Sequence, residues 1–473
     1  MRRHLVWFRN DLRTTDHPAL HGAAQGAHVT AVYLLTPVQW QQHGLSDFKI
    51  ALILRSVDRL SEQLSQLGIS LQICTAKDFV QAPEAILKCV QSLGADALFF
   101  NEEVAINESR RDQAVAQVMQ HSGIRVETFS SQTSMPPGSV VKPDGSPYSV
   151  FTPFKKRWLA DYRPDHIDPL PAPKPQGPQP SPSATPQRVG DVDKSIGEQL
   201  WKAGQTAAMT LLKSFIKTRI QSYQASRDFP AQRGTSVLSP HLAIGTISPR
   251  QCLHAAHAAN GRRLVGASEG INAWVSELIW REFYSHILAA YPKLAMGHAF
   301  KTETDSLPWG TDQEALERWQ RGETGLPLVD AGMRQLNTTG WMHNRLRMVT
   351  ATFLAKQLFL DWRLGEAYFM RQLVDGELAA NNGGWQWSAS TGTDAVPYFR
   401  IFNPVRQAER FDPSGDFVRS MVPELADLPT RHIFEPWRHG GAAGYPSPMV
   451  DLSEARQKTL AIWKQGRLLA EDG

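Results

Sequence analysis

The sequence is poor in cysteine and has no long apolar run. Only three of its 473 residues are cysteine, and Cys74, Cys89 and Cys252 match no disulfide or metal-binding spacing. We expect them to be reduced, buried apolar residues, and we expect no metal site. No stretch of about 18 apolar residues and no apolar N-terminal leader is present, which argues against a membrane span and a signal peptide. These absences predict a soluble, cytoplasmic protein, which we expect to be a monomer.

Two further absences limit the fold classes and the ligand-binding motifs that the sequence allows. The chain has no internal repeat, and no Gly-x-Gly-x-x-Gly follows its first apolar run, so the dinucleotide fingerprint is missing. The formal charge of +4 and the pI near 8.9 show no strong excess of one sign. A nucleic-acid partner is compatible with that balance but is not required by it. The length suits two or three domains.

The first 130 residues alternate between short apolar runs and amphipathic stretches. Strands are predicted at residues 4–8, 29–35, 71–74, 97–100 and 125–129, with helices at 49–67 and 82–93 between them. Gly68 and Gly94 stand where helix C-caps belong. This alternation predicts an α/β domain, a doubly wound, Rossmann-like parallel sheet, over residues 1–130.

The middle of the chain is rich in proline, and the remainder has a helical pattern. Nine of the 23 residues from Pro164 to Pro186 are proline, which predicts an extended linker within residues 131–200. After about Ile196, apolar stripes at i and i+4, such as Ile279-Phe283-Ile287, replace the strand pattern. We therefore expect an all-α domain over residues 201–473.

Tryptophan is concentrated in that second half. Eight of the fourteen tryptophans lie between Trp274 and Trp387. The run from Asp375 to Trp387 contains Asn-Asn-Gly-Gly, whose residues allow a sharp backbone turn and a close approach to a ligand. Together these features favour a protein that binds planar rings or moves electrons between them. Trp309, Trp362 and Trp385 have no local explanation, and each taken alone fits core packing.

A helix start is predicted at Thr235–Pro240. Ser239 would be the N-cap and Pro240 the first helical residue, and a helix N-terminus attracts phosphate. Capping by serine is routine, however. On this hexamer alone, a plain helix cap is the more common interpretation.

A second polar face is predicted around residue 280. Glu277, Trp280, Arg281 and Tyr284 fall at i, i+3, i+4 and i+7, opposite the stripe that contains Ile279. A carboxylate, an indole and a guanidinium on one face suit a flat polar ring such as a pyrimidine. A solvated helix face with a weak Glu–Arg pair explains the same pattern equally well.

The segment from Trp341 to Met348 predicts a helix with two faces. Leu346 and Thr350 would point inward, while Asn344, Arg347 and Met348 would line another side. A single histidine such as His343 is more often a hydrogen-bonded core residue than a catalyst.

At these residues the chain resembles the photolyases of the photolyase/cryptochrome family. The resemblance covers almost the whole chain, and its motifs follow in order at residues 6–13, 16–20, 223–240, 277–284, 340–348 and 375–387. It is most similar to bacterial class I enzymes that repair cyclobutane pyrimidine dimers. The resemblance implies an antenna-binding α/β domain and a helical domain that binds FAD.

The resemblance assigns roles to residues at the flavin. Tyr223 and the segment Thr235-Ser236-Val237-Leu238-Ser239 would hold the diphosphate and neighbouring groups, and the implied FAD contacts also include Trp274, Arg281 and Glu377. Arg347 and Asp375 would form an ion pair beside the isoalloxazine ring, and Asn381 would face its N5. At Glu377 the bacterial pattern usually has Asp.

It also implies a reaction. Fully reduced FAD, excited by light, would donate one electron to a dimer flipped out of the helix of UV-damaged DNA, and would recover it after the ring opens. Trp280 and Trp387 would pack on the dimer, and Glu277 would hydrogen-bond its bases. Further contacts are implied for Asn344, Arg345 and Met348 at the dimer, Arg227 and Arg400 at flanking phosphates, and Trp309, Trp362 and Trp385 in electron transfer to oxidised flavin.

An antenna is implied as well. His43, Asn107 and Glu108 match positions that contact 5,10-methenyltetrahydrofolate in bacterial relatives. Those relatives carry a lysine in the stretch that corresponds to residues 291–298 of this chain. Here the lysine is replaced near Met296, so we expect weaker binding of the folate's polyglutamate tail.

Three alternatives are open. A cryptochrome-type blue-light receptor would share the fold without repair, but Asn381, the Trp280 and Trp387 pair and the lack of a long tail after Gly473 argue against it. A (6-4) photolyase would carry two adjacent histidines where this chain has His343-Asn344. A DNA-binding or electron-transfer flavoprotein without photochemistry would leave the tryptophans and pocket residues unexplained.

Overall fold

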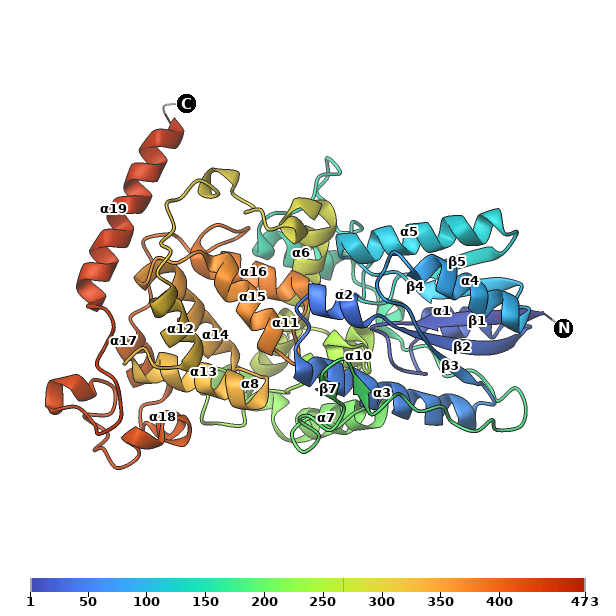
Figure 1. Ribbon diagram of the computed structural model, residues 1–473, viewed down its shortest axis with the longest axis horizontal. Helices are drawn as coiled ribbons and strands as arrows, with labels where there is room; N and C mark the ends of the chain where they lie inside the picture. Colours follow the sequence, from blue (N-terminus) through green and yellow to red (C-terminus); the bar gives the residue numbers. More distant parts are fainter. Residues whose placement is uncertain (1, 267, 472–473) are drawn as a thin grey trace. The chain divides into compact units, whose positions relative to one another are not determined.

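The computed structural model describes residues 2–266 and 268–471, and these form two compact units (Figure 1). Unit 1 comprises the chain up to Gln224, Ser236–Pro292 and Val374–Ala379, whereas unit 2 comprises Ala225–Thr235, Lys293–Leu373 and the chain from Ala380 onward. The units therefore interleave along the sequence. The three ranges predicted as domains, 1–130, 131–200 and 201–473, stay a prediction.

Unit 1 contains a five-stranded parallel sheet in the order β3-β2-β1-β4-β5. The strands are β1 (Arg3–Phe8), β2 (His28–Leu35), β3 (Leu71–Thr75), β4 (Ala97–Asn101) and β5 (Arg125–Phe129). Each lies within a residue of its predicted range, and the parallel pairing confirms the predicted doubly wound sheet. For β1, β2 and β4 the prediction succeeds because strands buried on both faces are continuous apolar runs in the sequence.

The helices of unit 1 connect these strands and continue beyond them. They are α1 (Pro18–Ala23), α2 (Pro37–Gln42), α3 (Asp47–Gln66), α4 (Ala82–Leu93), α5 (Ile106–His121), α6 (Phe151–Asp161), α7 (Gln205–Thr218), α8 (Tyr223–Ser226, to Gln224 in this unit), α9 (Ser239–Ala243), α10 (Pro249–Ala259) and α11 (Glu269–Ala290). Helices α4 and α5 pack on each other, and their apolar side chains bury Trp7 and Phe100 of the sheet. Gly94 ends α4 in the left-handed conformation, as its position predicts.

Cys74 departs from the expectation of burial, whereas Cys89 is buried as expected. Cys74 on β3 is only partly buried, and its Sγ lies 3.1 Å from Sγ of Cys89 on α4. The sequence shows no pair, because residues fifteen apart meet only when the strand and the following helix pack together. Cys252 is buried, as expected.

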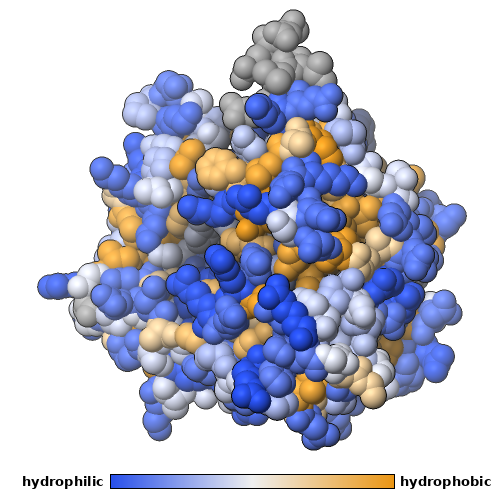
Figure 2. Space-filling model, turned by 90° about the vertical axis from the view of Figure 1, so that its left-hand side faces the viewer, coloured by the Kyte–Doolittle hydropathy of each residue, from blue (hydrophilic) through white to orange (hydrophobic). Residues whose placement is uncertain are grey.

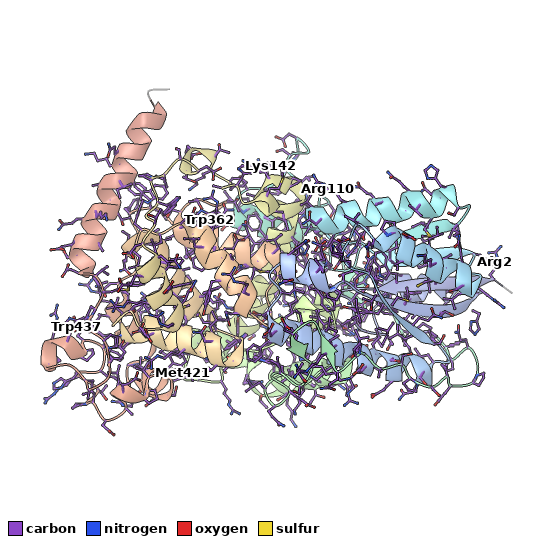
Figure 3. The ribbon with its side chains drawn as sticks, in the orientation of Figure 1. Arg2, Arg110, Lys142, Trp362, Met421 and Trp437 are labelled. Carbon is purple, nitrogen blue, oxygen red and sulfur yellow. The ribbon has the colours of Figure 1, made fainter. Side chains whose placement is uncertain are left out.

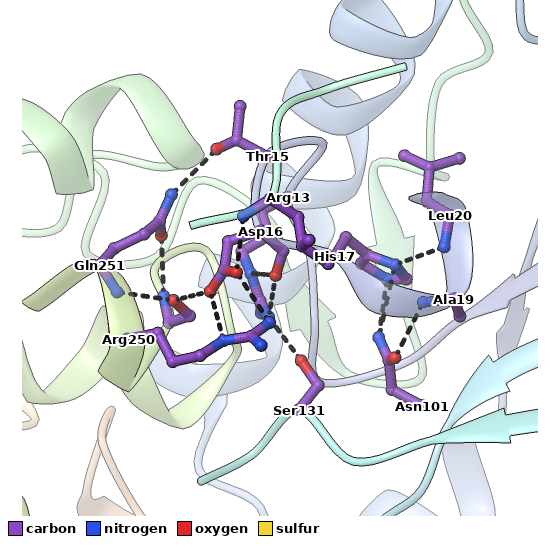
Figure 4. A network of polar contacts seen from close by, with 12 residues as sticks. Arg13, Thr15, Asp16, His17, Ala19, Leu20, Asn101, Ser131, Arg250 and Gln251 are labelled. Atoms are coloured by element: carbon purple, nitrogen blue, oxygen red, sulfur yellow. Dashed lines mark hydrogen bonds and ion pairs between the residues drawn. The ribbon is translucent and has the colours of Figure 1, made fainter. Parts of the chain in front are cut away.

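A buried polar network joins the loop after β1 to α10 within unit 1 (Figure 4). Asp16 is fully buried with a positive φ of 53°, and its carboxylate accepts from Ser248 and pairs with Arg250 at 2.7 Å. Arg13 donates to the carbonyl of Asp16 at 2.8 Å and to Ser131 at 2.5 Å. A strained, buried carboxylate of this kind persists only when the surrounding contacts over-determine it.

The proline-rich stretch follows the surface of unit 1. It contains a short 3-10 helix at Pro164–Ile167, and a two-stranded ribbon of β6 (Arg188–Val189) and β7 (Val192–Asp193) follows it. Ser183 and Thr185 donate backbone N–H groups to Ser61 and Asp58 of α3, at 2.7 and 2.6 Å. These bonds hold the extended chain along that helix.

Among the described residues, the regular secondary structure of unit 2 is helical, apart from one isolated β-bridge between Gly310 and Leu360. Its helices are α12 (Gln313–Arg321), α13 (Pro327–Thr339), α14 (Asn344–Thr352), a π-helix (Phe353–Gln357), α15 (Trp362–Gln372), α16 (Leu378–Ala389, from Ala380 in this unit), α17 (Pro404–Phe411), α18 (Asp416–Met421) and α19 (Leu452–Glu471). Trp362, labelled in Figure 3, is fully buried in the apolar core of this unit. Figure 2 faces the side with α17–α19, where hydrophilic residues separate several apolar patches. The predicted α/β and all-α architecture is confirmed.

Helix α16 corrects one expectation. The Asn-Asn-Gly-Gly run was expected to favour a sharp turn, but residues 378–389 are helical throughout. Asn and Gly are weak helix formers, so tertiary contacts decide the conformation here. Asn382 bonds to Glu366 at 2.9 Å, and the buried Trp385 packs on Phe369. Within the described ranges, no helix is both long enough and apolar enough to span a membrane.

Candidate functional site

In unit 1, an aromatic cluster supports the segment expected at the FAD diphosphate. Tyr223 and Trp274 both pack on Phe215, with ring centroids 5.8 and 5.1 Å away. The indole N–H of Trp274 donates to the hydroxyl of Ser236 at 3.4 Å. Three of the residues predicted at FAD are therefore linked through Phe215 and Trp274.

The backbone of that segment is constrained. Val237 has a positive φ of 54°, which costs a β-branched residue of order 1–3 kcal/mol. The helix begins at Ser239 and its N-cap is Leu238, so the predicted cap at Ser239 is wrong by one residue. Strain at Val237 is better explained by a functional constraint than by simple capping.

The polar face of α11 is not a solvated surface. Arg281 forms two bonds with the carboxylate of Glu377, at 2.9 and 2.7 Å, and a third with the carbonyl of Gln132 at 2.7 Å. Trp280 stacks on Phe151, with centroids 3.6 Å apart and planes 9° from parallel. Glu277 is partly buried on the same face.

The residues predicted at the antenna form one cluster in unit 1. Nδ1 of His43 lies 3.3 Å from the carboxylate of Glu108, and its Nε2 lies 3.1 Å from the amide of Asn107. Gln39 also reaches Nε2, at 2.8 Å. The side chain of His43 contacts the ring of Phe79 edge-on at 5.5 Å.

In unit 2, α14 begins later than predicted. His343 is its N-cap and accepts from the N–H of Arg345 at 3.1 Å, and burial lowers the pKa of His343 to about 4. The histidine is therefore a neutral structural residue. Asn344 is exposed, Met348 is partly buried, and Arg345 pairs with Asp228 at 2.9 Å.

The amide of Asn381 is oriented by its neighbour on α15. Its Nδ2 donates to the carbonyl of Glu366 at 3.0 Å, which leaves Oδ1 at the other end of the amide. Burial raises the pKa of the Glu366 carboxyl to about 7, although the hydrogen bond from Asn382 opposes that shift. Gly384 follows one turn later, and a Cβ built there would meet nothing within 4 Å. Gly384 is exposed and places no side chain on the face of α16 beside Asn381.

The three predicted electron-transfer tryptophans belong to one apolar core. Trp362 and Trp385 are 0% and 2% exposed, whereas Trp309 is only partly buried at the edge of that core. Phe369 lies 4.9 Å from Trp385, and Phe359 lies 4.9 Å from Trp309. Trp319, which sequence reasoning did not select, approaches Trp385 at 6.0 Å.

The remaining predicted residues are divided between the two units. Trp387 and Arg400 are in unit 2, where Trp387 is partly buried and Arg400 is exposed beside Phe399, itself 56% exposed. Arg227 is in unit 2 as well. Arg347 belongs to unit 2 and Asp375 to unit 1, so their ion pair stays a prediction. No group of three or more metal-ligating side chains occurs among the residues that the structure describes.

Comparison with known proteins identifies the family. Residues 4–176 match the family model described as DNA photolyase, and residues 274–465 match the FAD binding domain of DNA photolyase. The deoxyribodipyrimidine photo-lyase of Escherichia coli is 44% identical over 99% of both chains. The chain belongs to the DNA photolyase family.

Solved structures agree with this assignment. A bacterial class III photolyase from Agrobacterium tumefaciens is 35% identical, with a TM-score of 0.86 over 99% of this chain and 98% of its own. A cryptochrome from Synechocystis has the same TM-score at 28% identity, over 98% of this chain and 99% of its own. The fold is thus shared with one structure named a photolyase and one named a cryptochrome.

FAD fits the residues of this photolyase-family chain. The strained Val237 segment supplies backbone and hydroxyl groups, and α16 supplies an oriented amide beside open space at Gly384. Glu366 was missed by sequence reasoning, because only the packing of α15 on α16 brings it beside Asn381 and Asn382.

Proposed function

We propose that the protein is a light-driven DNA repair enzyme that splits cyclobutane pyrimidine dimers in UV-damaged DNA. The supporting observation is the 44% identity, over nearly the full length of both chains, to an enzyme named deoxyribodipyrimidine photo-lyase. The reaction is a lyase reaction, in which two carbon–carbon bonds of the cyclobutane break. The proposal includes a monomer that acts in the cytoplasm.

Reduced FAD, when bound and excited by light, supplies the electron that opens the dimer and takes it back afterwards. The residues that would hold it are Tyr223, Thr235, Ser236, Val237, Leu238, Ser239, Trp274, Arg281, Arg347, Asp375, Glu377 and Asn381. Backbone N–H and hydroxyl groups suit the diphosphate.

Asn381 would control the proton at N5 of the flavin. Because its Nδ2 donates a hydrogen bond to the carbonyl of Glu366, its Oδ1 is the atom that would accept a hydrogen bond from the flavin. An acceptor at that place favours a protonated N5, as reduced flavin has. Asn381 would therefore stabilise the form of the cofactor that repair needs.

The dimer would be bound after it has flipped out of the duplex. Trp280 can offer only one face to it, since Phe151 covers the other, and Trp387 would supply a second aromatic surface. Glu277 and Asn344 would bond the base edges, with Met348 and Arg345 beside them. Hydrogen bonds placed where negative charge develops would stabilise the one-electron-reduced dimer.

Two further parts complete the proposal. Arg227 and Arg400 would neutralise phosphates that flank the lesion. Trp309, Trp362 and Trp385 would carry electrons inward from the surface, since their burial rises from Trp309 to the other two.

An antenna chromophore is proposed at the cluster of His43, Asn107 and Glu108. The cluster presents ring nitrogen, amide and carboxylate groups that suit the polar edge of a pterin. If 5,10-methenyltetrahydrofolate binds there, purified protein reconstituted with it and freed of unbound folate should show an added absorption band from the bound folate, and His43→Ala should remove that band. An unchanged band in the variant would move the antenna elsewhere.

The decisive experiment is irradiation of an oligonucleotide that contains a thymine dimer, with chemically reduced enzyme. We expect thymine absorbance to return in the light and not in the dark. FAD binding without any repair would favour the cryptochrome alternative. Failure of the purified chain to bind FAD at all would contradict the proposal.

A further inference from the structure

The segment Asp375-Gly376-Glu377 carries two residues proposed to contact FAD. It lies between α15 and α16, and residues 374–379 group with unit 1. Two cationic side chains of unit 1 contact it. Arg281 of α11 pairs with Glu377 through two hydrogen bonds, and Lys49 of α3 donates to the carbonyl of Gly376 at 2.5 Å.

Lys49 is placed by the start of its helix. Ser46 is the N-cap of α3 and accepts the backbone N–H of Lys49 at 3.1 Å, which fixes the first turn. The lysine is 7% exposed, so its ammonium is not in water. Burial lowers its pKa, and the carboxylates of Glu377, Asp375, Glu103 and Glu108 oppose that shift.

Burying an ammonium group to make one hydrogen bond to a carbonyl has a high desolvation free energy. Taking such a charge out of water costs several kcal/mol unless nearby anions and hydrogen bonds offset the loss. A neutral donor such as Gln could satisfy Gly376 at a smaller desolvation cost. The charge itself is therefore the property that needs an explanation, and the neighbouring Asp375 and Glu377 supply one.

We propose that Lys49 is a positioning residue for the flavin-binding segment. Its N–H group fixes the carbonyl of Gly376, and its charge balances the two carboxylates that flank this glycine. The inference rests on the proposed function, because it takes Asp375 and Glu377 as FAD contacts.

Loss of the charge has two consequences. Of the two cationic side chains described above, only Arg281 would still contact the segment, through Glu377, so the segment would be less ordered. The surroundings of the bound cofactor would also become more negative. Reduced flavin is an anion at neutral pH, and a more negative site lowers its reduction potential and its affinity.

The test compares three variants of the full-length protein. Lys49→Met removes the charge and the donor, Lys49→Arg keeps both, and Lys49→Gln keeps a donor without the charge. Lys194→Met is the matched control, since Lys194 is a partly buried lysine of unit 1 that also donates to a carbonyl, that of Thr185, at 3.2 Å. FAD titration of the apoprotein, the midpoint potential of bound FAD and hydrogen exchange at residues 374–379 are measured.

We expect Lys49→Met to weaken FAD binding about tenfold or more, as loss of a charged hydrogen bond does. Its midpoint potential should fall, and amides 374–379 should exchange faster in the apoprotein. Lys49→Arg should restore affinity to within about twofold and Lys194→Met should match the parent. Lys49→Gln should keep slow exchange but show the lowered potential.

The proposal would be overturned if Lys49→Met and Lys49→Gln both had the FAD affinity and the midpoint potential of the parent protein. Equal losses in Lys49→Arg and Lys194→Met, which would indicate a general loss of stability, would also overturn it. If Lys49→Met does not fold, the potential of Lys49→Gln decides. If the parent protein binds no FAD, the proposed function fails first, and exchange at residues 374–379 still reports whether Lys49 orders the segment.

Discussion

At the scale of single residues, neighbours from other elements set the chemistry of the site. Asn381 has its orientation from Glu366, and His343 is neutral because it is buried as a helix cap. Residue type alone suggested polar groups near a flat ring. The direction of each donor and acceptor depends on contacts that only the fold creates.

Trp385→Phe tests the tryptophan series. The variant should lose at least about tenfold in the rate of light-driven reduction of oxidised flavin, because phenylalanine is far harder to oxidise than tryptophan. Repair by chemically reduced enzyme should remain. Trp437→Phe serves as a control in the same unit. Loss of both activities in Trp385→Phe would show that Trp385 has a different role.

Glu366→Gln tests the raised pKa. The folded protein holds the Glu366 proton up to about pH 7, above the ordinary value of 4.5, so ionisation destabilises the fold as pH rises through that window. At pH 8 the variant should be more stable than the parent by roughly 1–3 kcal/mol, and near pH 4.5 the difference should vanish. Denaturant unfolding at both values measures this. The exposed Glu303→Gln should show no such gain, and a pH-independent effect of Glu366→Gln would contradict the assignment.

At the scale of elements, α15 and α16 show how packing overrides local preference. A weak helix-forming run becomes regular helix because Trp385 fits against Gly365 of the preceding helix. A Cβ on Gly365 would lie 2.1 Å from the Trp385 ring and 2.6 Å from Leu354. The glycine is needed for close approach and not for a turn.

Gly365→Ala should therefore be destabilising. We expect a loss of roughly 1–3 kcal/mol in unfolding free energy, because the buried indole must shift. Gly384→Ala on α16 is the matched control, since an added Cβ meets nothing there, and it should be neutral or stabilising by up to about 1 kcal/mol. Equal stability of both variants would disprove this account of the helix pair.

At the scale of the whole molecule, the chain crosses between its two compact units several times. Unit 1 takes three segments of the sequence, and residues 374–379 join it from between two helices of unit 2. The residues proposed to contact FAD therefore come from distant parts of the sequence. The net charge of +4 is small, so DNA affinity must come from a few placed arginines and the lesion itself.

Salt dependence of DNA binding tests this at the same scale. Affinity for dimer-containing DNA should fall linearly on a log–log plot against salt, and Arg400→Ala should reduce the slope by about 1 while keeping the preference for damaged DNA. Arg2→Ala, an exposed arginine of unit 1, should leave the slope unchanged. An unchanged slope in Arg400→Ala would remove Arg400 from the phosphate contacts.

The sequence by itself determined the parallel strands of the sheet, the helices between them, the helical second half and the family motifs. Each of these follows from a local pattern in the sequence, either a periodicity of apolar residues or a short run of residues. Burial of one or both faces of an element requires such a pattern. Only the tertiary structure decided that 378–389 is helix, that Cys74 meets Cys89, that Glu366 orients Asn381 and that Lys49 contacts Gly376. These depend on pairs of residues far apart in the chain, and no local pattern records which distant side chain will fill the space beside them.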